Sequence, residues 1–174
     1  DGALKLLPFA AYERLHMEAL TTDLARAGKT APGGFLRSVG GALRDAPGRL
    51  SLFFRPWSDP RVVWRSHSTT EGRQWSDPMR TTQPCPLSGV AAFALADRVG
   101  LVYNHTDAHA RYPLSLSTSR DGGLSWSEPW HFERIDYEVS YPQFHERPDG
   151  GAHGVYSYNR RVIKYVCFEP RDIP

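Results

Sequence analysis

The sequence is poor in several features that would assign it quickly to a class of protein. Its 174 residues include two cysteines, Cys85 and Cys167, too few for a disulfide framework, so we expect two ordinary buried thiols. No uninterrupted apolar run is long enough to cross a bilayer. The formal net charge of +2 gives no broad electrostatic signal for nucleic acid. Composition therefore argues against a disulfide scaffold, a membrane-spanning chain and a nucleic-acid-binding chain.

A targeting signal is also missing from the first residues. Asp-Gly-Ala-Leu-Lys has no basic segment followed by an apolar block, and the first residue is not Met. We therefore expect a processed chain or part of a longer one, and no compartment follows. What the chain has in quantity is 14 Pro, 15 Gly, 5 Trp, 8 Tyr and 8 Phe, a mixture that favours many short strands joined by turns.

The chain repeats itself with a period of about fifty residues. RVVWRSHSTTEGRQWSDP at 61–78 matches RYPLSLSTSRDGGLSWSEP at 111–129, and Trp75 and Trp126 are 51 positions apart. A third copy without the turn reads GAHGVYSYN and then RVIKYVCFEP, at 151–170. A repeat of about 50 residues with four short strands is typical of a propeller blade.

Three blade units are predicted, near 35–82, 86–133 and 138–170. The middle unit should hold strands near 88–95, 98–104, 113–118 and 128–133, with Leu114 and Leu116 on one face and Ser115 and Ser117 on the other. Because propellers close with about four to eight blades, three blades should be part of a longer propeller. A chain complete at this length would instead have to self-associate to bury its open faces.

The first part of the chain differs from the repeats. Residues 12–27 carry Leu15, Leu20 and Leu24 at helical spacing and contain no Pro or Gly, which predicts one amphipathic helix. GKTAPGG at 28–34 follows as a linker. We therefore expect a helical segment and linker at 1–32 and blades at 33–174. The helix is expected to pack on the propeller side, with partner binding as the alternative.

Ser119, Asp121, Gly123 and Trp126 have the spacing of an Asp-box. An Asp side chain can accept hydrogen bonds from backbone N–H groups of its own turn, and Gly can adopt positive φ there. The copy at 68–75 has Thr70 in place of the Asp. We expect a structural turn rather than a catalytic one. A calcium loop would need further acidic partners that Asp121 lacks.

With these residues, and with SYP at 140–142 and YSYNRRVIK at 156–164, the chain resembles the sialidase (neuraminidase)-like BNR/Asp-box repeat family. Residues 33–170 can be laid on that pattern. The resemblance implies an all-β fold, a partial β-propeller of about three blades and of the six-bladed sialidase type, preceded here by the expected N-terminal α-helix. It also implies a glycosidase.

Blade geometry separates the loops into two groups. In a four-stranded meander, the 2–3 loops and the connections between blades lie at one end, and the 3–4 turns with the Asp-box pattern lie at the other. The first group of loops should form a mouth near the axis that gathers the following residues: Arg55, Asn104, Asp107, Arg111, Glu138, Tyr141, Arg160 and, from the start of the first blade, Arg37. Guanidinium groups bind carboxylates in a bidentate way, so an anionic sugar suits this mouth.

The resemblance assigns roles to these residues. Sialidases use an arginine cluster to hold the substrate carboxylate, a tyrosine activated by a glutamate as nucleophile, and an aspartate as acid/base. Carried over, Tyr141 is the nucleophile, Glu138 its base, and Asp107 or His105 the acid. Substrate binding falls in the same way to Arg37, Arg55, Asn104, Arg111 and Arg160.

Other interpretations of these residues stay open. Tyr141 could be a packing residue at a strand start, and Arg65, Arg73 and Arg161 are expected to be solvated. HTDAH at 105–109 matches zinc patterns weakly, so no metal or other cofactor is expected. The chain also departs from sialidases: FLRSV at 35–39 only loosely echoes Phe-Arg-Ile-Pro, and Tyr156-Ser157 stands where they carry Tyr-Glu.

Two functions from different classes follow. The first is an exo-glycoside hydrolase of the sialidase type that cleaves a terminal acidic sugar. The alternative is a non-catalytic or degenerate Asp-box propeller that binds glycan or protein, and a pure scaffold is a third reading. The expected partner is a glycan or acidic sugar, with no nucleic acid and no membrane span.

Overall fold

The computed structural model describes residues 39–174 apart from 47, 57–58, 71 and 96, and side chains from residue 48 onward. The predicted helix at 12–27 and Arg37 therefore lie outside the described residues. The described part is built of antiparallel strands in three sheets. Among its helices, none has the length and apolar character needed to cross a membrane.

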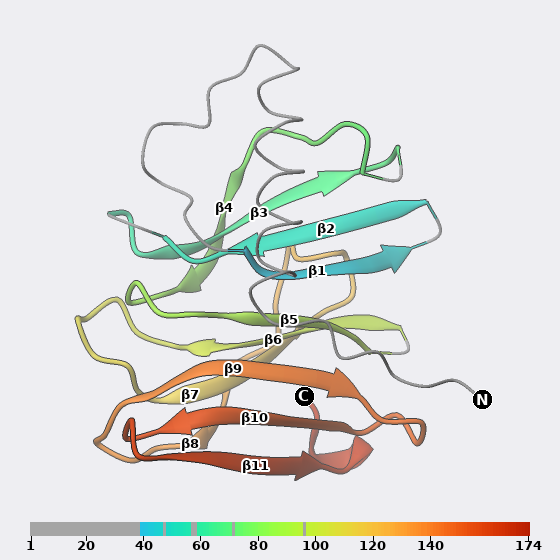
Figure 1. The fold of residues 1–174 in the computed structure, drawn as a ribbon. Coiled ribbons are helices and arrows are strands. Elements are labelled where there is room, and N and C mark those ends of the chain that lie inside the picture. Colours follow the sequence, from blue (N-terminus) through green and yellow to red (C-terminus); the bar gives the residue numbers. More distant parts are fainter. Residues whose placement is uncertain (1–38, 47, 57–58, 71, 96) are drawn as a thin grey trace.

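Each sheet corresponds to one predicted blade (Figure 1). The first contains β1 (Val39–Ala46), β2 (Arg49–Phe54), β3 (Val62–Ser68) and β4 (Met79–Pro84). The second contains β5 (Ala91–Leu95), β6 (Arg98–Asn104), β7 (Leu114–Ser119) and β8 (Trp130–Glu133). The third has β9 (Val139–Glu146), β10 (Ala152–Tyr158) and β11 (Val162–Phe168), and the 3₁₀ helix Pro170–Asp172 follows it.

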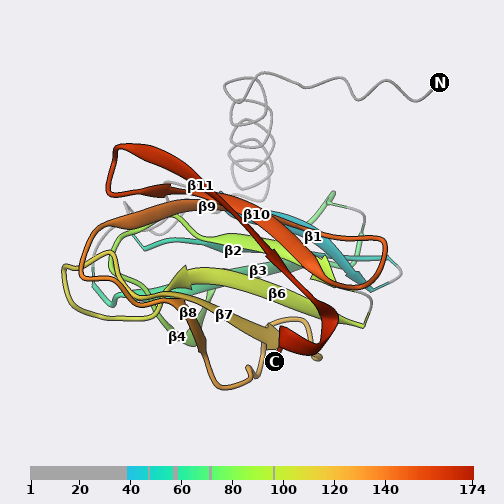
Figure 2. The ribbon, with the colours of Figure 1, turned by 90° about the horizontal axis from the view of Figure 1, so that it is seen from below.

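The sheets are meanders that face one another. Seen from the side of β11, they lie one behind another (Figure 2), and the innermost strands β1, β5 and β9 are neighbours in that order. This arrangement confirms the partial propeller. The third blade has three strands rather than four, which agrees with the missing turn in its sequence.

The core lies between the blades. Leu114 and Leu116 of β7 belong to a buried cluster with Phe144 and Tyr156 of the third blade. Ser115 and Ser117 occupy the opposite face of β7, and they are buried too. The predicted alternation is therefore right, and both faces are buried because a neighbouring blade covers each of them.

A second cluster joins the first two blades. It contains Phe53 and Val63 from the first blade and Leu101 and Tyr103 from the second, with Trp126 packed against it. The turn at 119–126 reaches over to the first blade, where the rings of Trp126 and Phe53 meet edge to face with 5.7 Å between their centroids. Aromatic pairs favour such contacts, so the turn helps to dock one blade on the next.

Arg65 corrects one expectation, because it is only 4% exposed rather than solvated. A Cβ atom built on Gly123 would lie 3.1 Å from Arg65 Cδ, which places the turn of the second blade directly over this side chain. Sequence reasoning within one blade could not foresee a cover that comes from the next blade.

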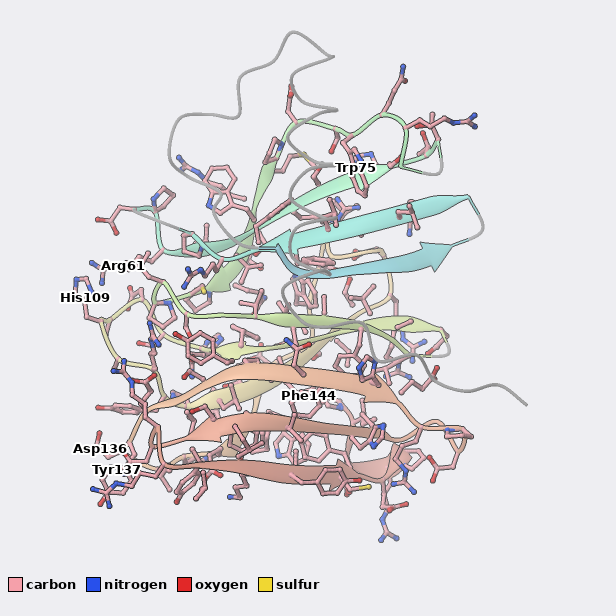
Figure 3. The ribbon with its side chains drawn as sticks, viewed as in Figure 1. Arg61, Trp75, His109, Asp136, Tyr137 and Phe144 are labelled. Atoms are coloured by element: carbon pink, nitrogen blue, oxygen red, sulfur yellow. The ribbon has the colours of Figure 1, made fainter. Side chains whose placement is uncertain are left out.

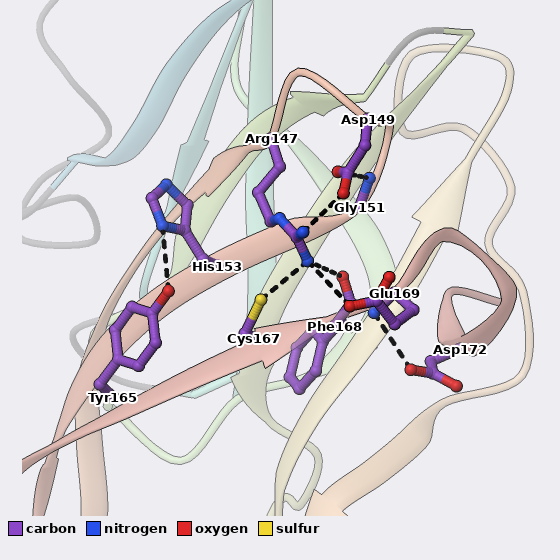
Figure 4. A network of polar contacts seen from close by, with 9 residues as sticks. All are labelled: Arg147, Asp149, Gly151, His153, Tyr165, Cys167, Phe168, Glu169 and Asp172. Atoms are coloured by element: carbon purple, nitrogen blue, oxygen red, sulfur yellow. Dashed lines mark hydrogen bonds and ion pairs between the residues drawn. The ribbon is translucent and has the colours of Figure 1, made fainter.

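Cys167 corrects another expectation: Cys85 is buried but Cys167 is exposed. Cys167 lies on β11, which pairs with β10 alone among the strands that the structure describes. The guanidinium of Arg147 donates a hydrogen bond to its Sγ at 2.8 Å and forms ion pairs with Asp149 and Glu169 (Figure 4). This network ties the hairpin between β9 and β10 to the end of the chain.

Candidate functional site

The loops predicted to form a mouth do share one end of the sheets. Arg61 and His109 project at the same end as Asp136 and Tyr137, whereas Trp75 lies away from them (Figure 3). Strand β7 separates the two groups of loops, because Arg111 precedes its first residue, Leu114, and the turn at 119–126 begins at its last, Ser119. Arg111 and Trp126 therefore belong to opposite ends of one blade.

The backbone connects the loops of the second and third blades at the mouth. Val139 N donates to Arg111 O at 2.9 Å, and Asn159 N donates to Glu138 O at 2.7 Å. Beneath them, the amide of Asn104 donates to Val139 O at 2.9 Å and to Pro113 O at 3.3 Å. These bonds hold three separate loops in register at the start of β9.

Glu138 is the charged centre of the mouth. Its Oε1 accepts from Arg111 Nη1 at 2.9 Å and from Ser140 Oγ at 2.9 Å, and its Oε2 accepts from Arg160 Nε at 2.7 Å. Burial alone would raise the pKa of Glu138, but the hydrogen bonds from Ser140 and Arg160 and the charge of Arg111 outweigh it and lower the pKa. The carboxylate therefore stays ionised between two arginines.

Tyr141 stands beside this centre in an unusual backbone conformation. Its φ of 56° is in the left-handed region, which costs free energy for a residue other than glycine. The pairing of β9 with β10 shifts register at the same place, and the Tyr141 side chain is turned outward and 55% exposed. Arg111 donates to its hydroxyl at 3.2 Å and lies over its ring, with 5.5 Å between Cζ and the ring centroid.

The structure thus brings four predicted residues together: Arg111, Glu138, Tyr141 and Arg160. The Arg160 side chain is 70% exposed and that of Arg111 is 24% exposed, so both arginines are open to solvent. Arg111 donates to both Glu138 and Tyr141, and burial, which would lower its pKa, is outweighed by these two partners, so that its pKa is raised. Such a set can hold an anion next to an exposed phenol.

Arg55 approaches the mouth from the first blade. Its Nη1 donates to Leu87 O at 3.2 Å, in the segment that leads into the second blade. Burial raises the pKa of the nearby Cys85 thiol to about 12, and the charges of both Arg55 and Arg111 oppose that rise. The positive charges of both arginines therefore act on the same buried thiol, although the two residues come from different blades.

Two further predicted residues are placed differently. Asn104 is fully buried, so its side chain supports the loops rather than lining the mouth. Asp107 is exposed, and its backbone carbonyl accepts a hydrogen bond from Arg61 at 2.8 Å. Arg61 also contacts His109 Nε2 at 2.6 Å and pairs with Asp59 at 3.2 Å.

A hydrogen-bonded pair of tyrosine and glutamate does exist, but between residues that sequence reasoning did not select. Tyr156 OH donates to Glu133 Oε2 at 2.6 Å, and Lys164 Nζ lies 2.5 Å from the same oxygen. Tyr156 is 1% exposed, and burial together with Glu133 raises its pKa. The pair joins the second and third blades and is closed to a substrate. Ser140 was also missed, although it adjoins Tyr141 in the SYP motif.

Solved structures of sialidases and of a lectin resemble this fold. A mutant of NanB sialidase from Streptococcus pneumoniae matches over 77% of this chain and 23% of its own, with 16% identity and a TM-score of 0.66. The intramolecular trans-sialidase from Ruminococcus gnavus matches over 78% of this chain and 32% of its own, with 18% identity and a TM-score of 0.59. A fucose lectin from Kordia zhangzhouensis matches over 74% of this chain and 91% of its own, with 13% identity and a TM-score of 0.50.

These likenesses concern the fold. The chain spans about a quarter of the NanB sialidase, and matches of this kind include an endo-arabinanase as well as sialidases and a lectin. No curated protein matches the sequence significantly. The model of the BNR repeat-like domain matches residues 26–154, most of the chain. The chain therefore belongs to the BNR repeat-like domain family, with a sialidase-like propeller fold.

Proposed function

We propose that this chain contributes the acidic-sugar site of an exo-glycoside hydrolase of the sialidase type. The observation that supports it most is the contact of Arg111 with both Glu138 and Tyr141 at the mouth, beside the exposed Arg160. The resemblance to sialidases supports the same assignment. We propose that the turns at 68–75 and 119–126 are Asp-boxes. They would have a structural role at the end of the blades opposite the mouth.

Binding comes first in this proposal. Arg111 and Arg160 would hold the carboxylate of a terminal acidic sugar, since planar guanidinium groups match carboxylates in geometry and charge. Glu138 already neutralises one of the two positive charges, so one further anionic group would balance the pair. Arg55 would add charge from the first blade, and Asn104 would keep the loops in place.

Tyr141 would then act as the nucleophile. Its oxygen would attack the anomeric carbon as the glycosidic C–O bond breaks, forming a glycosyl-tyrosine that water later hydrolyses. Glu138 would take the phenolic proton, and Asp107 would protonate the departing oxygen. Arg111 supports the attack, because a donor to the phenolic oxygen stabilises the negative charge that develops there.

A glycan-binding function without hydrolysis is the second candidate. It is favoured by Glu138, whose carboxylate is engaged by two arginines and Ser140 and is thus a weak base in this arrangement. Asp107 also favours this candidate, because its side chain is exposed and its backbone carbonyl accepts a hydrogen bond from Arg61.

Binding and turnover should be measured on the same preparations of the full 174-residue chain. The methyl glycoside of sialic acid serves for calorimetry, and a fluorogenic sialoside for hydrolysis. Arg160→Ala should weaken binding roughly tenfold or more, because a charged hydrogen-bond donor is lost. Arg161→Ala is the matched control, since it removes an exposed arginine from the next position.

Tyr141→Phe separates the two candidates. Turnover by the parent chain that disappears in Tyr141→Phe supports hydrolysis. Binding that depends on Arg160 in a parent without turnover supports the second candidate. Absence of binding, or equal loss in Arg160→Ala and Arg161→Ala, contradicts both.

A further inference from the structure

A polar cluster lies where β4 of the first blade meets β6, β7 and β8 of the second blade. Tyr103 OH contacts Gln83 from the first blade, Ser117 Oγ at 3.1 Å and His105 Nδ1 at 2.7 Å. Ser115 Oγ contacts His131 Nδ1 at 2.8 Å. The rings of His105 and His131, here called the histidine pair, are 5.5 Å apart between centroids and inclined at 47°.

Both imidazoles are anchored in the same way. Each uses Nδ1 for its hydrogen bond to a hydroxyl group, and both hydroxyls belong to the cross-strand partners Tyr103 and Ser115. Histidines that bind metal ions commonly fix one ring nitrogen in this manner and present the other to the ion. The Nε2 atoms of the histidine pair are the nitrogens left for such a role.

The separation of the rings suits a shared ion. A tetrahedral ion about 2.1 Å from one nitrogen of each ring places the two ring centres roughly 5 Å apart. The 5.5 Å observed between the ring centres is close to this separation. Both histidines are partly exposed, so an ion could enter from solvent.

We propose that His105 and His131 together bind a divalent transition-metal ion such as Zn²⁺ through their Nε2 atoms. Within the described residues there is no group of three or more His, Cys, Asp or Glu side chains placed to hold a metal. The site would therefore have two protein ligands and keep its other positions for water or an external ligand, unlike a closed structural zinc site.

The spacing of histidines in HTDAH alone would pair His105 with His109 as metal ligands. In the structure, His109 contacts Arg61, whereas the ring of His105 lies beside that of His131 on β8. His109 therefore serves as a matched control, because it is an exposed histidine of the same loop that the proposed site does not use.

Calorimetric titration of Zn²⁺ into the untagged, chelator-treated full chain tests the proposal. We expect one ion per chain, with affinity lowered roughly tenfold or more in His105→Ala and in His131→Ala and unchanged in His109→Ala. Ser115→Ala keeps both imidazoles but frees one ring, and it should lower the affinity by about tenfold.

Thermal unfolding of each variant without metal checks that the variant folds. Zn²⁺ should raise the melting temperature of the parent chain and of His109→Ala, and should leave His131→Ala unaffected. No Zn²⁺ binding by the folded parent, or binding that His131→Ala retains while His109→Ala loses it, would overturn the proposal.

Discussion

The turn at 68–75 and the turn at 119–126 form the same pattern of hydrogen bonds with partly different residues. Both close with a backbone bond of 2.8 Å, from Ser76 N to His67 O in the first and from Ser127 N to Thr118 O in the second. In both, the leading serine accepts from the backbone of a glycine, at 2.9 Å for Ser68 and 2.7 Å for Ser119. The shape of the turn therefore does not depend on the aspartate.

The two turns differ at their third residue, which is Thr70 in the first turn and Asp121 in the second. Thr70 Oγ1 accepts one backbone bond, from Gln74 N at 2.8 Å. Asp121 accepts from Leu124 N at 3.0 Å, from Ser125 N at 2.9 Å, from Ser125 Oγ at 2.5 Å and from Ser119 Oγ at 2.7 Å. A hydroxyl can thus replace the carboxylate, but with fewer donors and without charge.

The surroundings differ as well. Gly72 has its own blade around it, with Leu50 and Trp75 as the nearest side chains. Gly123 lies against Phe53 of the preceding blade. The first turn therefore stabilises one sheet in the described structure, whereas the second also joins two sheets, and the mutations below test that difference.

Gly123→Ala should have the largest effect. Its φ is +93°, and the new Cβ would lie 2.7 Å from Phe53 Cζ. Backbone strain and overpacking together should therefore lower the free energy of unfolding by about 3 kcal/mol. Gly72→Ala at φ +78° meets its nearest atom at 3.6 Å, so strain alone should cost about 1 kcal/mol. Urea denaturation measures both, and equal losses would contradict the docking role of the second turn.

Asp121→Ala comes next. Removing the shared acceptor of several backbone and hydroxyl groups should cost about 2 kcal/mol, against about 1 kcal/mol for Thr70→Ala, which removes a single strong acceptor. The same urea experiment gives both values. A larger loss in Thr70→Ala would show that the hydroxyl is the more important anchor.

Thr70→Asp should stabilise the chain by about 0.5–1 kcal/mol, because the first turn would gain charge-assisted bonds of the kind Asp121 makes. Thr70→Asn is the matched control, with similar shape and no charge. If the two variants have the same midpoint in urea, charge does not explain the difference between the turns.

The smallest effect is a dependence on pH. Burial would raise the pKa of Asp121, but the hydrogen bonds from Ser125, Ser119 and Leu124 N outweigh it, so the folded pKa lies below the ordinary value of 3.8. The stabilisation is therefore complete above about pH 4 and is lost as the pH falls toward the folded pKa. Between pH 5 and 2, the urea midpoint of the parent should fall more than that of Asp121→Asn. Parallel curves would contradict this sign.

Much of the fold could be predicted because its signals are local. The fifty-residue repeat, the alternation of Leu114 and Leu116 with serines, and the turn residues each involve neighbours in sequence. Contacts between blades could not be predicted in this way, so Arg65 was expected in solvent and Cys167 in the core, and both expectations were wrong.

The candidate site shows the same division. Pattern and resemblance selected Arg111, Glu138, Tyr141 and Arg160, and the structure brings them together. The sequence did not indicate that Tyr141 would contact Arg111, that Asn104 would be buried, or that His105 would face His131. These partners come from separate strands and loops.

The sequence by itself determined the strands, the turns and the number of blades, because strand alternation and turn hydrogen bonds arise among residues a few positions apart. Only the tertiary structure decided which side chains meet. The partners of Glu138, the cover over Arg65 and the histidine pair all depend on how whole sheets pack around the axis. That packing is a sum over many buried side chains, so no short stretch of sequence carries it.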